Sequence, residues 1–482
     1  MTGPVMLAIL WHIVYYPQTT RQDPKRRSVE FQDRKHAMAS RLVPLAILVS
    51  VAILGLPSHS YPQTPPPPLS AANTLQPGTL IDSNNDARYA QFLPAAVQAA
   101  IRYGLKVRVI PTQRLDWSAG FTKATEKYSA QVGLDPEDDI TNYVAGAPFP
   151  TVDTSDPKAA VKISYNWHMG PFMPDDFSLA PWGSFAYSSQ EPNDIQPEED
   201  YNYVCDRFTF LRFAHRTEVE PRPTFGSNSQ GFEWKARCNE WTANPAGDVG
   251  EGSGIWLRYL DPHRGDEFYG FDPESRRVRR AGSASIAVNE ACRSCHQPYW
   301  AYALPKTEAY QYRLLGTTPL LACMTASEEP AGLKQETMSL TLREEPFELR
   351  NAYILEMTPK AAGSGNLRVL VFVDTEAYVW LAAEFFETSE RTAVAVPLWR
   401  SHPSPAGGNL FDLAGEFYIP SHQPSMSGKF EHNAIHTRNG ITSPNYARWF
   451  FRTLRPARED FDQKINSGDV AEEAFNPQAL AR

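Results

Sequence analysis

The residues best suited to chemistry are two cysteines and a histidine in one short segment. Cys292 and Cys295 are separated by two residues, and His296 follows directly. At this spacing two thiols can form thioethers with the vinyl groups of haem while the imidazole ligates the iron. The sequence therefore predicts one covalently attached haem c, with Cys292, Cys295 and His296 binding the cofactor and His296 as the ligand of the haem iron.

Two other interpretations of this segment stay open. The two cysteines could form a redox disulfide, since thiol–disulfide chemistry often uses this spacing. They could instead bind zinc together with Cys205 or Cys238. The sequence does not single out a sixth ligand for the haem iron: Met324, Met357 and His263 are equal candidates, and an open coordination position is another.

A group of arginines stands shortly before this segment. Arg276, Arg277, Arg279 and Arg280 place four positive charges close together in a chain whose formal net charge is -9. On a strand, Arg277 and Arg279 share one face. We predict that they contact a ligand, through lipid headgroups, haem propionates or a phosphate. The alternative is a solvated strand edge held by ion pairs.

Other functional signatures are missing from the sequence. It contains no Gly-x-Ser-x-Gly elbow, no phosphate loop and no His-Glu-x-x-His. The chain has 55 acidic against 46 basic residues, and this balance argues against nucleic acid as a partner. We therefore expect a binding protein rather than an enzyme.

The start of the chain is predicted to direct export. Residues 38–60 have a short basic start, an apolar run over Leu42–Leu56 and small residues at the two positions that determine cleavage. We interpret 38–60 as a signal peptide, with an uncleaved anchor as the alternative, and 1–37 as an extension foreign to the native chain. The mature protein would begin near Tyr61, in an oxidising compartment.

One disulfide is predicted for that compartment. Strands expected over Tyr201–Phe213 and Gly231–Trp241 can form a hairpin, which would bring Cys205 and Cys238 opposite or nearly opposite each other. Cys323 would then stay unpaired.

The elements that position these residues change in character along the chain. We expect a Pro-rich linker over 61–80, a mixed α/β segment over 81–145, an antiparallel β domain over 146–455 and a polar tail over 456–482. In the mixed segment, apolar spacing predicts helices over Pro94–Tyr103 and Trp117–Ala130 and a strand over Leu105–Ile110.

Beyond Gly146, short apolar runs separated by Pro, Gly, Asn and Asp predict strands. They are expected over Tyr201–Phe213, Gly231–Trp241, Gly254–Leu260, Phe268–Arg280, Phe347–Met357, Leu367–Val373 and Ala377–Phe386. Forty-one prolines also favour a β protein rich in loops.

The run Leu367–Val373 is apolar on both faces, so helices, a second layer or a bound apolar ligand must cover it on each side. We predict an internal cavity for an acyl or polycyclic ligand, with an ordinary filled core as the alternative. Its lining would be Val369, Val371, Val373, Tyr378 and Trp380.

Several separated segments resemble one known family. Asn142–Pro150, followed by Asp156-Pro157 and Tyr165-Asn166, resembles the N-terminal motif of an uncharacterised bacterial family of outer-membrane lipoprotein-sorting-like proteins. Arg276–Arg280 resembles the arginine-rich strand of that family, and Tyr353–Glu387 resembles its paired carboxy-terminal strands. The resemblance extends over roughly residues 80–455, most of the mature chain.

The resemblance implies an α+β fold that is mostly β, with a small helical N-terminal part. Its main element would be a long curved antiparallel sheet, an open half-barrel wrapped round a helix as in the LolA/LolB lipoprotein carriers. It implies a place in the periplasm or at the periphery of the outer membrane. The implied function is a carrier for a lipid or other hydrophobic small molecule, with a membrane exporter as partner. A c-type haem protein for electron transfer or sensing is the alternative.

Overall fold

The structure is a computed structural model that describes most of the chain from residue 75 to residue 481. The described part leaves out 103, 171–174, 189–201, 206–207, 245–251, 273–275, 284–305, 327–330, 335–338, 343, 361–366, 388, 405–406, 421–445 and 455–474. The predicted signal peptide and the predicted haem ligands Cys292, Cys295 and His296 lie outside the described residues. No helix in the described part is long and apolar enough to span a membrane.

One sheet contains 16 of the strands. They are β1 (Leu80–Ile81), β2 (Lys106–Val109), β5 (Asp176–Ser188), β6 (Asn202–Cys205), β7 (Phe208–Arg212), β8 (Phe232–Asn244), β9 (Gly252–Tyr259), β10 (Glu267–Asp272), β11 (Arg277–Ser283), β12 (Tyr310–Ala322), β15 (Glu344–Pro359), β16 (Leu367–Asp374), β17 (Trp380–Glu387), β18 (Glu390–Pro403), β19 (Asn409–Pro420) and β20 (Tyr446–Leu454). Two small separate ladders join β3 (Gly133–Leu134) to β4 (Ile140–Thr141) and β13 (Ala331–Lys334) to β14 (Ser339–Leu342).

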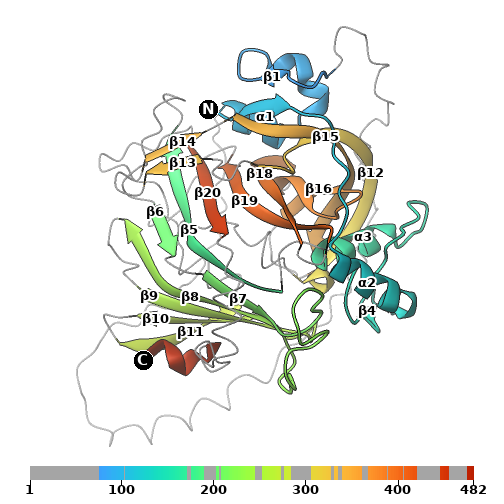
Figure 1. Cartoon of the computed structure of the whole chain (residues 1–482), viewed down its shortest axis with the longest axis vertical. Helices are drawn as coiled ribbons and strands as arrows, with labels where there is room; N and C mark the ends of the chain where they lie inside the picture. The colour runs from blue at the N-terminus through green and yellow to red at the C-terminus, as the bar shows by residue number, and fades with distance from the viewer. Residues whose placement is uncertain are drawn as a thin grey trace, which may run out of the picture. The chain divides into compact units, whose positions relative to one another are not determined.

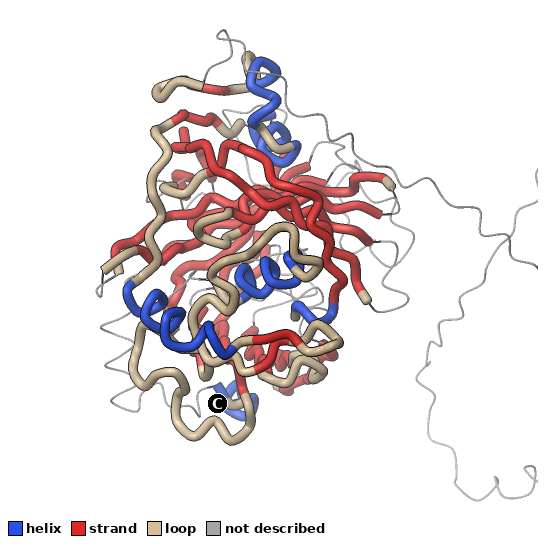
Figure 2. The backbone as a smooth tube through the Cα atoms, turned by 90° about the vertical axis from the view of Figure 1, so that its right-hand side faces the viewer, coloured by secondary structure: helices blue, strands red, loops and turns tan. Residues whose placement is uncertain are grey.

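The main sheet is curved and open (Figures 1 and 2). Its strand order is β1-β2-β15-β16-β17-β18-β19-β20-β5-β6-β8-β9-β10-β11, with β12 beside β15 and β7 beside β5 and β8. The described strand pairs of this sheet are antiparallel except β2 with β15, which is parallel. The first and last strands of this order do not pair with each other, so the sheet does not close. The predicted mostly β fold with a long curved sheet is confirmed.

The described residues form three α-helices beside the sheet: α1 (Ala95–Arg102), α2 (Ala119–Tyr128) and α3 (Ala159–His168). Short 3-10 helices are η2 (Asp86–Phe92), η3 (Ser129–Gln131), η4 (Thr307–Ala309) and η6 (Pro477–Ala481). The helices predicted over Pro94–Tyr103 and Trp117–Ala130 correspond to α1 and α2. No residue range was predicted for α3, although the family resemblance implied a curved sheet wrapped round a helix.

The single strand predicted over Phe268–Arg280 is wrong, because this stretch folds into the β10–β11 hairpin, with Asp272 opposite Arg277. Arg276 has a φ of 51°, a left-handed conformation typical of turns. The sequence also places a proline directly after Asp272, and a proline cannot donate to a central ladder.

Strands β15 to β18 are covered on both faces by helices. On one face, Ala160, Ile163 and Trp167 of α3 pack into a cluster that we call the α3-side core. It contains buried residues of ten strands and their connections, among them Phe210, Trp234, Trp256, Phe268, Leu355, Met357, Val369, Val371, Val373, Tyr378, Trp380, Phe385, Ala395 and Trp399. One short helix therefore lies against a lining that extends across most of the sheet.

The opposite face of these strands is covered by the N-terminal elements. We call this cluster the α1-side core; it joins Val97 and Ile101 of α1 to Ala382 of β17 and to Val394 and Val396 of β18. α1 forms here because its apolar residues are one helical turn apart and face the sheet. The parallel pairing of β2 with β15 holds α1 in this position.

A third core closes the other end of the sheet. Leu211, Phe213, Phe232, Ile255, Leu257 and Tyr259 pack with Phe475 and Leu480, which come from the C-terminal end of the chain. The C-terminal helix η6 lies beside β9, β10 and β11.

We expect both helices to be required for stability. Ile101 of α1 and Ile163 of α3 are 1% and 0% exposed, so replacing either by alanine should lower the free energy of unfolding by about 2–5 kcal/mol. Chemical denaturation would measure both effects. Leu260→Ala, at a position that is 41% exposed, is the control and should change little. A negligible effect at Ile163 would contradict the proposed packing of α3.

Candidate functional site

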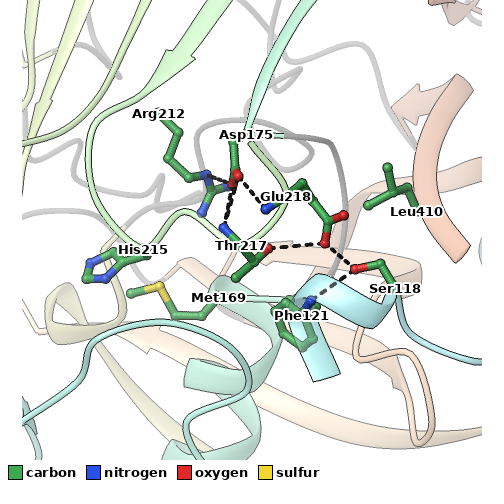
Figure 3. Close-up of a pocket in the computed structure, with 10 residues that line it drawn as sticks. Ser118, Phe121, Met169, Asp175, Arg212, His215, Thr217, Glu218 and Leu410 are labelled. Carbon is green, nitrogen blue, oxygen red and sulfur yellow. Dashed lines mark hydrogen bonds and ion pairs between the residues drawn. The ribbon is translucent and has the colours of Figure 1, made fainter. Parts of the chain in front are cut away.

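A small polar pocket lies where the loop after β7 meets the start of α2 and the end of α3 (Figure 3). Its lining residues are Ser118, Phe121, Met169, Gly170, Asp175, Arg212, His215, Thr217, Glu218 and Leu410. The volume of the pocket that is open to the centre of a water-sized group is about 10 Å³. The pocket therefore holds on the order of one water molecule. The pocket is therefore too small for an acyl chain.

Asp175 fixes the loop that follows β7. Its carboxylate accepts hydrogen bonds from the backbone N–H groups of Thr217 at 2.9 Å, Glu218 at 2.6 Å and Val219 at 2.9 Å. The Nε of Arg212 lies 3.9 Å from the same carboxylate, as Figure 3 shows. Three backbone donors on one buried carboxylate make this loop a rigid wall of the pocket.

Glu218 joins this loop to α2. Ser118 caps the helix, because its Oγ accepts the N–H of Phe121 at 3.1 Å and donates to the Glu218 carboxylate. The other carboxylate oxygen of Glu218 accepts from the Oγ of Ser404 at 3.2 Å. A negative charge at a helix N-terminus is stabilising, so Ser118 and Glu218 act as a cap rather than as a nucleophile and its base.

His215 connects the pocket to the motif Asn142–Pro150. Its Nδ1 lies 2.7 Å from the carbonyl oxygen of Val144, and its ring packs on Tyr143 with the centroids 4.5 Å apart. Burial lowers the pKa of His215. The neutral ring therefore donates its Nδ1–H to the carbonyl oxygen of Val144, and Nε2 is its unprotonated nitrogen.

The same motif also holds α3. Asn166 accepts the N–H of Phe149 at 2.9 Å and donates to its carbonyl oxygen at 2.6 Å. The hydroxyl of Tyr165 accepts the N–H of Ile140 at 3.0 Å and donates to Glu308 at 2.9 Å. The segments Asn142–Pro150 and Tyr165-Asn166, which carry the family resemblance, are therefore neighbours that position this helix.

A buried group of charges lies at the C-terminal end of α3. Arg258 donates to the Nε2 of His168 at 3.0 Å and to Glu233 at 3.0 Å, and its Nη1 is 3.7 Å from Asp266. Lys306 donates to three backbone carbonyl groups in the β9–β10 region, two of them at 3.0 and 2.7 Å. The group ties α3 to strands β8 and β9.

The pKa values of this group follow from burial and from Arg258. Burial, together with the charge of Arg258, lowers the pKa of His168 to about 3. Burial raises the pKa of Glu233, but the charges around it, of which Arg258 is the largest, outweigh burial and bring the pKa to about 2. At neutral pH, His168 is therefore uncharged and Glu233 is ionised.

A second buried group of charges lies under the β16–β17 turn. Arg350 donates to Asp374 at 2.8 and 3.1 Å, to Glu348 at 3.2 Å and to Glu376 at 3.0 Å. Asp374 also accepts the N–H groups of Glu376 and Ala377. This group was not predicted from the sequence; the available signal was that Glu348 and Arg350 alternate with the apolar residues Phe347 and Leu349 of β15.

The five residues predicted to line a ligand cavity do come together. Val369, Val371, Val373, Tyr378 and Trp380 are at most 4% exposed and lie in the α3-side core. Their role in ligand binding stays a prediction. Tyr378 adopts a φ of 54°, which makes β17 begin at Trp380 rather than at the predicted Ala377.

The predicted arginine ligands lie elsewhere. Arg277 and Arg279 are exposed on β11 and are thus outside the α3-side core. Of the candidate sixth haem ligands, Met324 and Met357 are buried in that core, whereas His263 is 77% exposed.

The structure gives the state of two of the described cysteines. Cys238 is disulfide-bonded and Cys323 is free and buried. Cys205 of β6 lies opposite Trp241 of β8, and Cys238 also lies on β8. The Cys205–Cys238 pairing itself stays a prediction.

A comparison with protein families gives one match that extends over more than half of the chain. Residues 80–391 match the family model described as "Protein of unknown function (DUF1329)". The chain belongs to the DUF1329 family. The match includes α1 to α3, both buried groups of charges and all the lining residues of the pocket except Leu410, so these are parts of the DUF1329 region. No curated protein matches this DUF1329 chain.

Solved structures similar to this DUF1329 protein include three bacterial proteins. A domain from Vibrio parahaemolyticus named for outer membrane lipoprotein sorting has 11% identity and a TM-score of 0.39, over 68% of this chain and 100% of that one. A DUF1329 family protein from Desulfovibrio piger has 12% identity and a TM-score of 0.36, over 66% and 96%. A LolA superfamily protein from Nitrosomonas europaea has 10% identity and a TM-score of 0.30, over 63% and 96%.

The buried neutral histidine predicts how stability depends on pH. The pKa of His168 is 6.5 in the unfolded chain and about 3 in the fold. The free energy of unfolding therefore has the full contribution of His168 above pH 6.5 and loses it as the pH drops towards 3. The slope per such group approaches 1.4 kcal/mol per pH unit. Protonation of Glu233 lowers the free energy of unfolding further only between pH 4.5 and about 2.

Urea denaturation at several pH values would measure this dependence. His168→Gln should make the slope between pH 6.5 and 4.5 shallower, because glutamine keeps an acceptor for Arg258 but does not titrate. His263→Gln, at the exposed histidine, is the matched control and should leave the slope unchanged. Equal slopes in all three proteins would contradict the assignment.

Proposed function

We propose that this protein is a carrier that binds a lipid or another hydrophobic small molecule along the α3-side core. The observation that carries the proposal is the arrangement of that core. A continuous apolar lining with many aromatic side chains follows one face of an open sheet, and α3 is the one α-helix of the described chain that contributes to it.

The helix α3 is suited to moving aside. It has 10 residues and no side-chain hydrogen bond at its N-cap, and helices of this length are not stable alone in water. Its position depends on Ile163 and Trp167 in the core and on polar contacts at its ends. A ligand that replaces those apolar contacts would let α3 leave without exposing the lining to water.

Strand β12 offers a way to the lining. Tyr310, Tyr312 and Leu314 lie on one face of this strand, are half-buried and pack against the α3-side core. β12 pairs with β15 alone among the described strands, so it is an edge. We propose that an acyl chain enters past these three side chains and reaches Val369, Val371 and Val373.

We place this carrier in the periplasm or at the periphery of the outer membrane, with a membrane exporter as its partner. The signal layout of residues 38–60 supports this location. The disulfide-bonded Cys238 supports it too, because disulfides persist in oxidising compartments.

The carrier proposal can be tested with two matched substitutions on opposite faces of the sheet. Val371→Thr adds a hydroxyl to the α3-side core, and Val394→Thr adds the same group to the α1-side core. Each should cost about 1–3 kcal/mol of stability. We expect only Val371→Thr to reduce the lipid that co-purifies with the protein, as measured by mass spectrometry of organic extracts.

Equal lipid content in both variants would argue against this ligand site. Absence of any lipid from native protein purified without detergent would contradict the carrier function itself.

The second candidate function is a c-type haem protein, and the segment Cys292–His296 is the observation that favours it. The two thiols would attach the cofactor and His296 would ligate its iron. Expressed with the haem-maturation machinery, the protein should give a pyridine haemochrome spectrum of haem c.

Two substitutions separate attachment from ligation. Cys295→Ala should greatly reduce attachment, whereas His296→Ala should alter the spectrum more than the yield. A colourless protein without a mass increase on these cysteines would leave only the carrier function.

A further inference from the structure

The helix α3 ends in a buried histidine that must be neutral to make its contact with the sheet. The side chain of His168 is 9% exposed, and its Nε2 lies 3.0 Å from a terminal nitrogen of Arg258. A guanidinium has donors only, so Nε2 is the acceptor of this hydrogen bond. An imidazolium cannot accept, because both of its nitrogens carry protons. The contact therefore exists only while His168 is uncharged.

The charged groups around His168 also oppose its protonation. Three of them are basic: Arg258 of β9, Arg212 of β7 and Lys306 beside η4. The fourth is Glu233 of β8, whose carboxylate lies 3.9 Å from Nε2 but accepts from Arg258 at 3.0 Å. Burial and the basic groups together hold the pKa of His168 at about 3, against 6.5 for a histidine in water.

The sheet side of this contact does not require His168. Arg258 keeps Glu233 at 3.0 Å and Asp266 at 3.7 Å, so removal of α3 leaves this buried charge with its two carboxylate partners. Once α3 lies in water, the ring of His168 regains its ordinary basicity. Opening of α3 and protonation of His168 therefore favour each other.

We infer that α3 is a pH-sensitive cover, in which uptake of one proton by His168 releases the helix from the sheet and favours the open state that takes up the ligand. The inference rests on the proposed function, because that function makes the open state the one that binds. Ligand uptake would then be coupled to proton uptake from the solvent, and the proton would leave again when the ligand dissociates and α3 closes.

Acidification favours the open state because only the open state takes up the proton well above pH 3. The exposed ring is protonated as the pH falls below 6.5, whereas the buried ring is protonated only near pH 3. The open fraction should therefore rise roughly tenfold from pH 7.5 to pH 5.5. Glu233 stays ionised in this range, since its pKa in the closed state is about 2.

Binding of pyrenyldodecanol, a fluorescent long-chain alcohol without a titratable group, tests the inference on the full-length protein. Its dissociation constant should be roughly tenfold lower at pH 5.5 than at pH 7.5. His168→Gln keeps an acceptor for Arg258 but does not titrate, so its dissociation constant should be the same at both pH values. His263→Gln, at a histidine that is 77% exposed, is the matched control and should keep the native dependence.

Hydrogen–deuterium exchange without ligand gives an independent measurement. After correction for the intrinsic effect of pH on exchange, the protection of the amides in Ala159–His168 should fall roughly tenfold from pH 7.5 to pH 5.5. Low concentrations of urea should not change this protection, because α3 opens without global unfolding. His168→Gln should remove the pH dependence of α3.

The two measurements separate failure of the inference from failure of the carrier function. Tight binding of the alcohol with no change between the two pH values would overturn the inference and leave the carrier intact. Absence of binding at both pH values, together with acid-dependent opening of α3, would argue against the carrier and keep the pH-sensitive helix. Protection of α3 that falls with urea as steeply as that of the rest of the chain would overturn the inference, because α3 would then be released only by global unfolding.

Discussion

Strands β15 to β18 bury apolar residues on both faces, and the rest of the fold depends on covering them. A strand of this kind loses its stabilising hydrophobic contribution wherever water reaches either face. The chain meets this requirement with two separate helices. α1 covers one face and is held by the parallel pairing of β2 with β15, while α3 covers the other. The positions of both helices follow from this one constraint.

The buried charges determine where the covering elements sit. Arg258 joins the end of α3 to β8, and Arg350 joins β15 to the β16–β17 turn through Asp374. Such buried pairs contribute little net stability, since desolvation offsets much of their attraction. Removing one partner is costly, however, because the other charge is left buried alone. We therefore regard these groups as devices that fix position, and the small pocket beside Asp175 as part of the same scaffold.

The sequence allowed the main sheet to be predicted because strand patterns are local. Alternation and turn residues located β8, β9 and β16, and helical spacing located α1 and α2. The double-sided apolar run at Leu367–Val373 also indicated that something must cover both faces. The sequence could not show that α3 is the cover on one side, because its helix is short and its contacts with Phe149, Glu308 and Arg258 come from distant parts of the chain.

The candidate site was harder to predict from the sequence than the fold. The lining residues Val369, Val371 and Val373 were found because they lie on one strand. Asp175, Glu218 and Ser118 were not, since each is an ordinary polar residue until the fold joins the loop after β7 to α2. The β10–β11 hairpin was misjudged although the sequence Asp272-Pro273-Glu274-Ser275 is typical of a turn, and Arg276 directly after it adopts a left-handed conformation.

The carrier proposal requires that a hydrophobic ligand replaces α3 on the inner lining of the sheet. Hydrogen–deuterium exchange of the native protein, with and without an added long-chain fatty acid, tests this most directly. We expect faster exchange in the amides of Ala159–His168 when the fatty acid is bound, with the amides of α1 unchanged. Unchanged or slower exchange in α3, or equal changes in both helices, would contradict it.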